Sequence, residues 1–296
     1  MVKPMRAHVG LWTGTIESQP VSAISETAAV IEAQGWSSLW IPETVGREAF
    51  TASQLLLTAT STLEIGTGIA SIWGRDALAA ASAGRTLRAT SGNRFTMGLG
   101  VSHAPLVERM RGHNYRRPVA AMRDYLRTIQ QAPAIVPGEK ELAPIVIAAL
   151  GPKMLDAAVE FGVGVHPYLV TPEWTAVTRE RVGADTRIVV ELAAVVDPAA
   201  DDNEFQRRAH AHLEIYSGLP NYRASFERQG FSAEQDAVRG GSDRLKAAMV
   251  SRGIEATVAR IEEHFAAGAT DVVVQMLGTG PTHVPLEDWQ LLADAL

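Results

Sequence analysis

The stretch LEIGTGIASIWGRDALAAASAGRTLRAT, residues 63–90, decides the fold class because it holds one complete strand-to-helix unit. Its first nine residues have the apolar and small side chains of a buried strand. Gly66 and Gly68 weaken a strand interior, which indicates that another group lies close to this backbone. Asp76 stands where an N-cap is expected for the alanine-rich helix that follows.

The same unit recurs along the chain. Apolar runs alternate with amphipathic helical patterns, and such alternation favours parallel strands because each crossover returns the chain to the same end of the sheet. We therefore expect a (β/α)₈ TIM barrel that forms a single domain over residues 1–296. The eight predicted strands fall within residues 8–12, 37–41, 63–71, 94–100, 144–150, 162–170, 187–197 and 271–277.

Two features qualify this prediction. Residues 197–253 are too long for a simple crossover, so we expect a helical insertion between the seventh strand and the eighth helix. An open, doubly wound sheet is the alternative. It fits less well because no G-x-G-x-x-G sequence follows the first strand.

Composition excludes several classes of protein. The 296 residues are 46% hydrophobic and 20% charged, with a net charge of −6, as in ordinary globular domains. No basic run suggests a nucleic-acid partner. The chain has no cysteine, which excludes disulfides and thiolate catalysis. No apolar stretch predicts a signal peptide or a membrane span, so we expect a soluble, cytoplasmic protein.

In a barrel of this kind the active site lies at the carboxyl ends of the strands. No lysine ends a predicted strand, which disfavours Schiff-base chemistry. No histidines are spaced for a metal, so no metal site is expected. Small, aromatic and glycine residues remain, and such a lining suits a planar organic cofactor that carries the chemistry itself.

Five segments carry a resemblance that covers nearly the whole chain: residues 38–50, 65–77, 94–118, 147–155 and 164–173. They resemble the luciferase-like monooxygenase superfamily and, within it, the oxidoreductases that depend on coenzyme F420, a deazaflavin. The resemblance implies a barrel with a helical insertion near strand seven. It also implies hydride transfer between the deazaflavin and a small organic substrate.

The resemblance also implies the site residues. His103 and Glu43 are the catalytic candidates, His103 as a general acid or anion stabiliser. Many deazaflavin enzymes end strand two with Asp-His, where this chain has Glu43 and Thr44. The residues expected to bind the cofactor are Trp12, Glu43, Ala70, Ser71, Ile72, Gly100, Ser102, Ala149, Gly151, Pro152, Lys153, Met154, Tyr168 and Thr171.

The family also has a bulged strand in which a non-prolyl cis peptide supports the deazaflavin ring. We accordingly predict a bulge at residues 70–72, with the peptide bond between Ala70 and Ser71 in the cis form. The alternative is that Ser71 is an ordinary strand-end residue. Ala70 is expected to be small because the ring comes close to it.

Other candidates keep two interpretations each. Glu43 either caps a nearby helix or meets the cofactor. The helix start at 151–154 either binds a phosphate or is an ordinary Gly-Pro start. Glu191 is predicted to be structural, with Arg187 as a possible partner. Tyr222 and Arg223 either line a substrate pocket or form a surface turn.

The function predicted from the sequence is therefore that of an F420-dependent oxidoreductase. An FMN-dependent monooxygenase of the same superfamily is the first alternative, since the two share a fold. A barrel that binds its ligand without turnover is the second. The expected partner is a small-molecule substrate. The assembly state is left open, with a homodimer among the alternatives.

Overall fold

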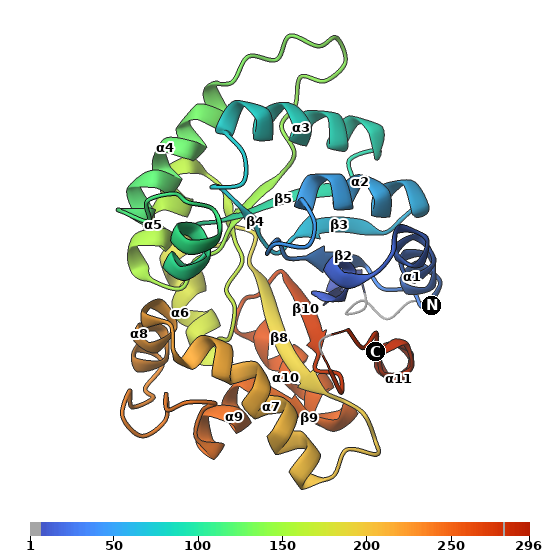
Figure 1. Ribbon diagram of the computed structural model, residues 1–296, viewed down its shortest axis with the longest axis vertical. Coiled ribbons are helices and arrows are strands. Elements are labelled where there is room, and N and C mark those ends of the chain that lie inside the picture. The colour runs from blue at the N-terminus through green and yellow to red at the C-terminus, as the bar shows by residue number, and fades with distance from the viewer. Residues whose placement is uncertain (1–6, 281) are drawn as a thin grey trace.

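The computed structural model describes residues 7–280 and 282–296, whose strands form one parallel sheet (Figure 1). Its neighbours run in the order β7-β6-β5-β3-β2-β1-β10-β8-β9, and β4 also pairs with β5. Sequence alternation of strands and helices thus correctly predicted a parallel α/β fold. The strands are β1 Val9–Trp12, β2 Ser38–Ile41, β3 Glu64–Thr67, β4 Ala70–Ser71, β5 Phe95–Gly100, β6 Ile145–Ile147, β7 Gly164–Val165, β8 Val189–Val195, β9 Val250–Arg252 and β10 Asp271–Met276.

The sheet is strongly curled, in the manner of a TIM barrel. β7 lies at one end of the strand order, yet Val165 forms a parallel bridge with Ile188, just before β8. The Val165 N–H also donates to the Arg187 carbonyl at 2.9 Å. Farther along, the same edge of β8 pairs with β9, from Ala193 to Val195. The early and late strands of the chain therefore meet.

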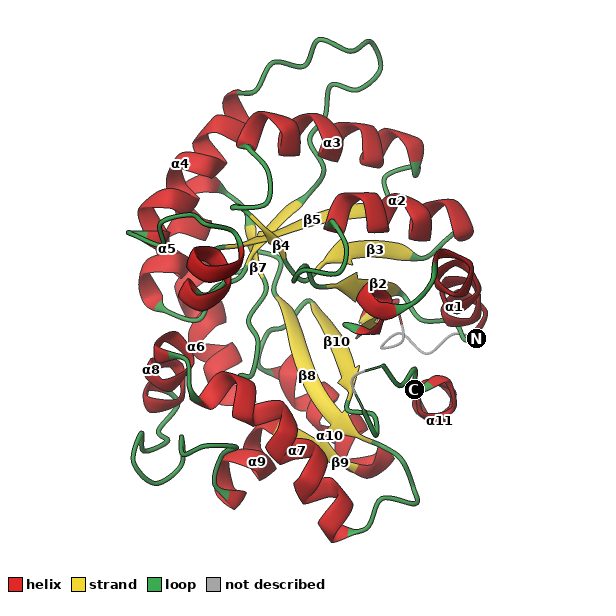
Figure 2. Cartoon of the chain, in the orientation of Figure 1, coloured by secondary structure: helices red, strands yellow, loops and turns green. Residues whose placement is uncertain are grey.

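Helices cover the outer side of the sheet (Figure 2). Two predicted starts are confirmed: Asp76 Oδ1 accepts the Ala79 N–H at 2.9 Å, and Thr171 Oγ1 accepts the Trp174 N–H at 3.4 Å. No helix in the described part of the chain is long and apolar enough to cross a membrane. These outer helices are α1 Val21–Ala33, α2 Ala49–Ala59, α3 Ala77–Thr90, α4 Pro118–Gln131, α5 Pro152–Phe161, α6 Pro172–Val182, α10 Gly253–Ala266 and α11 Leu286–Ala295.

Three helices follow β8 and precede β9: α7 Asp202–Ser217, α8 Pro220–Arg228 and α9 Asp243–Met249. Figure 1 shows α7 running beside β8. Two shorter helical segments lie in other loops, a 3₁₀ helix at Thr15–Ser18 and a π-helix at Pro105–Met110. The sequence analysis missed β9, which has only three residues, and α11, although Trp289, Leu292 and Ala293 give that helix a regular buried face.

Alternation along each strand sorts the side chains into two cores. On β1, Leu11 belongs to the core between sheet and helices, whereas Trp12 belongs to the core inside the curled sheet. The inner core also contains Trp40 of β2, and it continues into the buried faces of α7 and α8, for example at Phe226. Residues of α7, α8 and α9 thus complete the inner core that the strands begin.

The strand quoted at the outset is interrupted between β3 and β4. Gly66 pairs with Thr96 and Ala70 pairs with Leu99, so four steps on one strand match three on the other. One extra residue makes this a bulge. It lies at residues 67–69, before the predicted position, because Ala70 has already returned to register with β5.

The cis peptide is also displaced from its predicted position. The bond between Gly68 and Ile69 is cis, so the prediction of a cis bond between Ala70 and Ser71 was wrong. The glycine at this place has a steric reason: a Cβ on Gly68 would lie 2.6 Å from Trp12 Nε1. Gly66 likewise makes room for Trp40, whose ring would be 2.4 Å from an added Cβ. The glycines therefore accommodate two indoles inside the sheet.

A polar network closes the amino-terminal end of the interior. Arg187 donates to Glu64, at the start of β3, and to Asp271, at the start of β10, each at 2.9 Å. Its guanidinium also lies over the Trp40 ring, 5.8 Å from the centroid. These ion pairs join strands that are far apart in sequence.

Candidate active site

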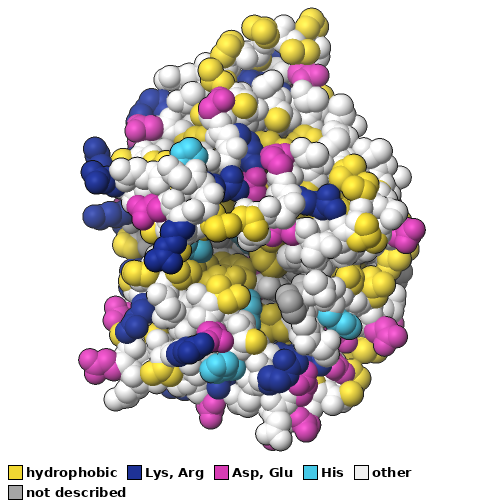
Figure 3. Space-filling model, viewed as in Figure 1, with side chains coloured by type: hydrophobic (Ala, Val, Ile, Leu, Met, Phe, Trp, Pro, Cys, Tyr) yellow, Lys and Arg dark blue, Asp and Glu magenta, His cyan; other side chains and the backbone are white. Residues whose placement is uncertain are grey.

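The carboxyl ends of the strands surround a hollow. Figure 3 shows apolar side chains gathered around it near the centre of the face, between the segment that follows β5 and helix α7. Parallel α/β folds bind their ligands at this end of the sheet. We call this region the mouth, and its inner lining comes from strand ends and from α7 and α8.

Glu43, at the end of β2, is held by three donors. Its Oε2 accepts the Ser71 N–H at 2.7 Å, and its Oε1 accepts the Ala49 N–H at 3.3 Å. Arg75 forms an ion pair with Glu43 and a second one, at 2.7 Å, with Glu48. Glu43 is only 6% exposed. This geometry makes Glu43 a positioning residue that fixes β4 and the loop after it. It also accepts the first N–H of α2, but the N-cap of that helix is Glu48.

Trp12 and His166 meet at the bulge. The Trp12 indole donates to the Gly68 carbonyl at 2.7 Å. His166 Nδ1 lies 2.7 Å from the Val189 carbonyl, so Nδ1 carries the proton and Nε2 does not. Nε2 has no partner among the described residues. Burial lowers the pKa of His166 to about 4, which keeps the ring neutral.

His103 lies on the loop after β5, where the sequence placed it. Its ring centroid is 5.7 Å from that of Tyr222 on α8. Its Nδ1 is buried and has no hydrogen-bond partner in the described structure. Burial lowers the pKa of the imidazole, so His103 is neutral at pH 7. Ser102 beside it has a φ of 56° and accepts the Tyr115 hydroxyl through its carbonyl, at 3.1 Å.

Tyr168 follows β7 and is the centre of an aromatic cluster. Its hydroxyl donates to Gln275 Oε1 at 2.6 Å and accepts from the Tyr216 hydroxyl at 2.9 Å. Its ring centroid lies 6.2 Å from those of His212 and Tyr222 and 5.7 Å from that of Trp12. We call His103, Tyr168, His212, Tyr216 and Tyr222 the mouth cluster. It joins two strand-end loops to α7 and α8.

The helix start at Gly151, one of the predicted cofactor contacts, has no side-chain cap. Lys153 is exposed beside it. Arg228 of α8, which the sequence analysis did not single out, donates to the Leu150 carbonyl at 3.1 Å. A Cβ on Gly151 would lie 3.4 Å from that guanidinium. Pro172 begins the neighbouring α6 after its cap, Thr171.

Four of the predicted cofactor contacts have side chains turned away from the mouth. Their side chains belong to the core between sheet and helices, so any contact with a ligand would come from their backbone: Ala70, Ile72, Ala149 and Met154. Ser71 is fully buried. The space beside Gly100 is filled by Ile69, 2.3 Å from an added Cβ. Because the Ala70 side chain lies in the core between the sheet and the helices, we attribute its small size to packing there.

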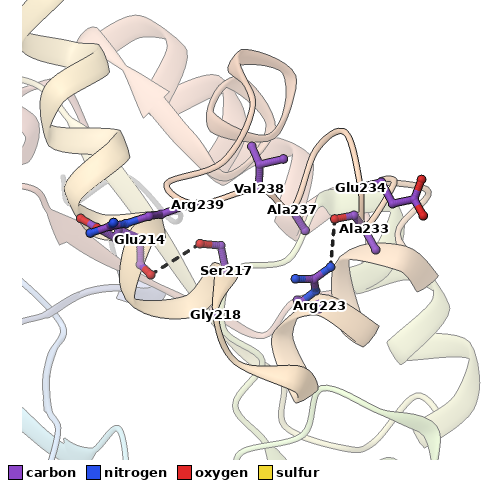
Figure 4. Close-up of a pocket in the computed structure, with 9 residues that line it drawn as sticks. All are labelled: Glu214, Ser217, Gly218, Arg223, Ala233, Glu234, Ala237, Val238 and Arg239. Atoms are coloured by element: carbon purple, nitrogen blue, oxygen red, sulfur yellow. Dashed lines mark hydrogen bonds and ion pairs between the residues drawn. The ribbon is translucent and has the colours of Figure 1, made fainter.

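A separate depression of 730 Å³ lies between α7, α8 and the loop that precedes α9 (Figure 4). Three of its charged side chains have partners: Arg239 pairs with Glu214, and Arg223 donates to the Ala233 carbonyl at 3.1 Å. No strand end contributes to it. Arg223, a candidate for the substrate pocket, thus faces this depression, whereas its neighbour Tyr222 belongs to the mouth cluster.

Comparison with known proteins agrees with this arrangement. The sequence profile of the luciferase-like monooxygenase family matches residues 5–279. This chain belongs to that family. A relative is the 5,10-methylenetetrahydromethanopterin reductase of Methanolobus tindarius, 27% identical over 254 residues, which cover 77% of each chain.

Two solved structures show a similar fold. The coenzyme F420-dependent tetrahydromethanopterin reductase of Methanopyrus kandleri superposes with a TM-score of 0.77 at 20% identity, covering 97% of both chains. The oxygenating constituent of the 3,6-diketocamphane monooxygenase of Pseudomonas putida, in complex with FMN, reaches 0.70 at 11% identity, over 97% of this chain and 96% of that one. The fold therefore serves both cofactors.

Sequence reasoning missed two members of the mouth cluster, His212 and Tyr216. The possible partnership of Glu191 with Arg187 is wrong, because Arg187 is engaged by Glu64 and Asp271 at the opposite end of the sheet. His212 and Tyr216 were not considered as site residues. Their spacing of four residues places them on one face of α7, and that periodicity was the available signal.

Proposed function

We propose that this protein is an F420-dependent oxidoreductase that transfers a hydride between the deazaflavin and a small organic substrate. The observation that carries the proposal is a set of buried polar atoms at the mouth without partners among the described residues. They are His103 Nδ1, His212 Nε2 and Glu191 Oε1. Buried polar atoms are rarely left unpaired in native proteins, so such atoms indicate a ligand or water.

The residues at the mouth fit a planar ring with polar edges. Trp12 and Tyr168 offer aromatic surface, and the unpaired atoms offer hydrogen bonds. When bound, the deazaflavin supplies a hydride donor or acceptor. The chain orients the reactants, excludes water and, at the neutral His103 imidazole, takes up or returns the accompanying proton. The helix start at Gly151, with Lys153, would receive an anionic group of the cofactor.

The proposal includes the organisation of the chain. Residues 1–296 would form one (β/α)₈ barrel domain, and residues 197–253 would be an insertion that covers the mouth. The contacts between Tyr168 and the two insertion tyrosines, Tyr216 and Tyr222, support this arrangement.

The test is a fluorescence titration of the purified protein with F420 and with FMN under the same conditions. We expect tighter binding of F420, because the Methanopyrus kandleri protein that shares this fold is a coenzyme F420-dependent reductase. Reduced cofactor should then donate a hydride without consumption of oxygen. Tighter binding of FMN, together with oxygen uptake during turnover, would assign the protein to the monooxygenases instead.

A further inference from the structure

Glu191 of β8 is a buried carboxyl group that has no charged partner among the residues that the structure describes. Its side chain lies on the same face of the strand as Val189 and Ala193, which belong to the inner core. It is 1% exposed. Oε2 accepts a single long hydrogen bond, 3.3 Å from the Leu169 N–H, and Oε1 has no partner among the described residues.

Burial raises the pKa of Glu191 to about 8, so the carboxyl group is protonated at pH 7. A protonated carboxyl offers one O–H donor. The ionisable side chains that its charge affects are Tyr168, Tyr216 and Tyr222. Burial raises the pKa of each phenol, to about 12 for Tyr216. All three phenols therefore stay neutral while Glu191 titrates.

The hydroxyl chain beside Glu191 has a fixed direction. Tyr216 donates to Tyr168, and Tyr168 donates to Gln275. The hydroxyl protons of Tyr216 and Tyr168 are thus both engaged, and the Tyr216 oxygen can still accept a hydrogen bond. His212 is buried, and its Nε2 has no partner in the described structure. Burial lowers the pKa of His212 to about 4, so it too is neutral.

The interior face of the mouth is therefore polar but uncharged at pH 7. It presents an O–H donor at Glu191 and acceptors at Tyr216 and the neutral histidines. Two cations near the strand ends are neutralised: Arg75 pairs with Glu43 and Glu48, and Arg208 pairs with Asp197 and Glu204. Arg228 and Lys153, at the start of α5, are not part of the mouth cluster. Transfer of a carboxylate or phosphate into such a place would cost its hydration without a compensating charge. A ketone or an alcohol would find partners for its oxygen.

We propose that Glu191 and the mouth cluster form a substrate subsite for an uncharged molecule that carries a carbonyl or hydroxyl oxygen. This inference rests on the proposed function, because it defines the substrate of the same site. A carbonyl oxygen accepts a hydrogen bond from Glu191. A hydroxyl donates to the Tyr216 oxygen or to an unprotonated histidine nitrogen.

The test uses three probes of one ring size: cyclohexanone, cyclohexanol and cyclohexanecarboxylate. Saturation-transfer NMR at pH 7 measures their dissociation constants for the protein, with and without F420. We expect the two uncharged probes to bind and the carboxylate to bind at least tenfold more weakly. Equal binding of the carboxylate, or no binding of either uncharged probe, would overturn the proposal.

Variants locate the binding. Glu191→Leu removes the donor and should weaken cyclohexanone binding about tenfold, the usual cost of a lost buried hydrogen bond. Glu191→Gln keeps an N–H donor and should bind within about threefold of the wild type. Glu64→Gln is the matched control at the opposite end of the sheet and should leave binding unchanged. Tyr216→Phe, which removes one hydroxyl, should weaken cyclohexanol binding and covers the case in which Glu191→Leu fails to fold.

The pH dependence adds a second criterion. Wild-type binding of cyclohexanone should weaken as pH rises above about 8, where Glu191 loses its proton, whereas Glu191→Gln should not respond. If neither Glu191→Leu nor Tyr216→Phe changes the binding of the probes, the subsite is refuted even if F420 binds. Conversely, the expected pattern in a protein that fails to bind F420 would support the subsite and reject the proposed function.

Discussion

At the scale of single residues, the mouth is defined by atoms that lack partners. His103 and Glu191 are both buried near the carboxyl ends of the strands, and each keeps one polar atom free within the described structure. Glu43, the other catalytic candidate from the sequence, has both oxygens engaged. The residues best placed for chemistry are thus the ones that the fold leaves unsatisfied.

His103→Ala should lower kcat by about 10²-fold, the usual contribution of a positioned acid or base. The affinity for F420, measured by fluorescence titration, should change much less. Steady-state kinetics with a substrate from the uncharged class above provides the measurement. His113→Ala, on the same loop but exposed, is the matched control and should retain wild-type kcat.

Glu43→Gln should behave differently from His103→Ala. Removal of one partner from a buried ion pair costs about 3–5 kcal/mol when the remaining charge is left uncompensated. Arg75 keeps its ion pair with Glu48, so we expect a cost at the lower end of this range. We expect a large loss of stability in urea denaturation, while the protein that remains folded turns over. A fully stable Glu43→Gln variant with abolished turnover would return the proton-transfer role to Glu43.

At the scale of elements, the strand that begins at Glu64 is shaped by its neighbours' indoles. Gly66→Ala would drive a methyl group into Trp40, 2.4 Å away, and should cost about 1–3 kcal/mol through overpacking. Gly218→Ala, where nothing lies within 4 Å of the added carbon, should be close to neutral. Urea denaturation measures the stability of both variants. Equal stability would show that the inner core shifts enough to accommodate the added methyl group.

Local sequence signals predicted most helices and strands but not the position of the bulge between β3 and β4. Asp76 and Thr171 were recognised as caps because capping depends on neighbours along the chain. The bulge was placed three residues late, because its position depends on how β5 resumes pairing at Leu99. No pattern within residues 63–71 contains that information.

The site was harder to predict than the fold for the same reason. Trp12 ends β1, and His103 and Tyr168 follow β5 and β7, so topology alone brings them to one end of the sheet. His212 and Tyr216 come from a segment whose docking depends on packing against Tyr168, which sequence patterns do not encode. The pairing of Arg187 with Glu64 and Asp271 joins residues 123 and 84 positions apart.

At the scale of the whole molecule, Glu191 links stability to pH. Its pKa is about 8 when folded, against 4.5 for an exposed glutamate. Between these values the folded state binds more protons than the unfolded state, so its contribution to stability falls as pH rises from 4.5 to 8. Glu191→Gln does not titrate and should gain stability relative to the wild type across that window.

Urea denaturation at pH 5, 6, 7 and 8 measures this difference. Other titrating groups cancel when the variant is compared with the wild type at each pH. A constant difference between the two proteins would mean that Glu191 is ionised throughout the range, and hence that a cation or ordered water compensates it.

The ion pairs of Arg187 with Glu64 and Asp271 have a consequence for engineering. They tie three strands together at the end of the sheet opposite the mouth, and none of the mouth cluster takes part in them. The amino-terminal end of the sheet and the mouth are thus held by separate sets of contacts. A library that randomises Tyr216 and Tyr222 but spares Arg187 should retain many folded members, so new substrate preferences can evolve without rebuilding the scaffold.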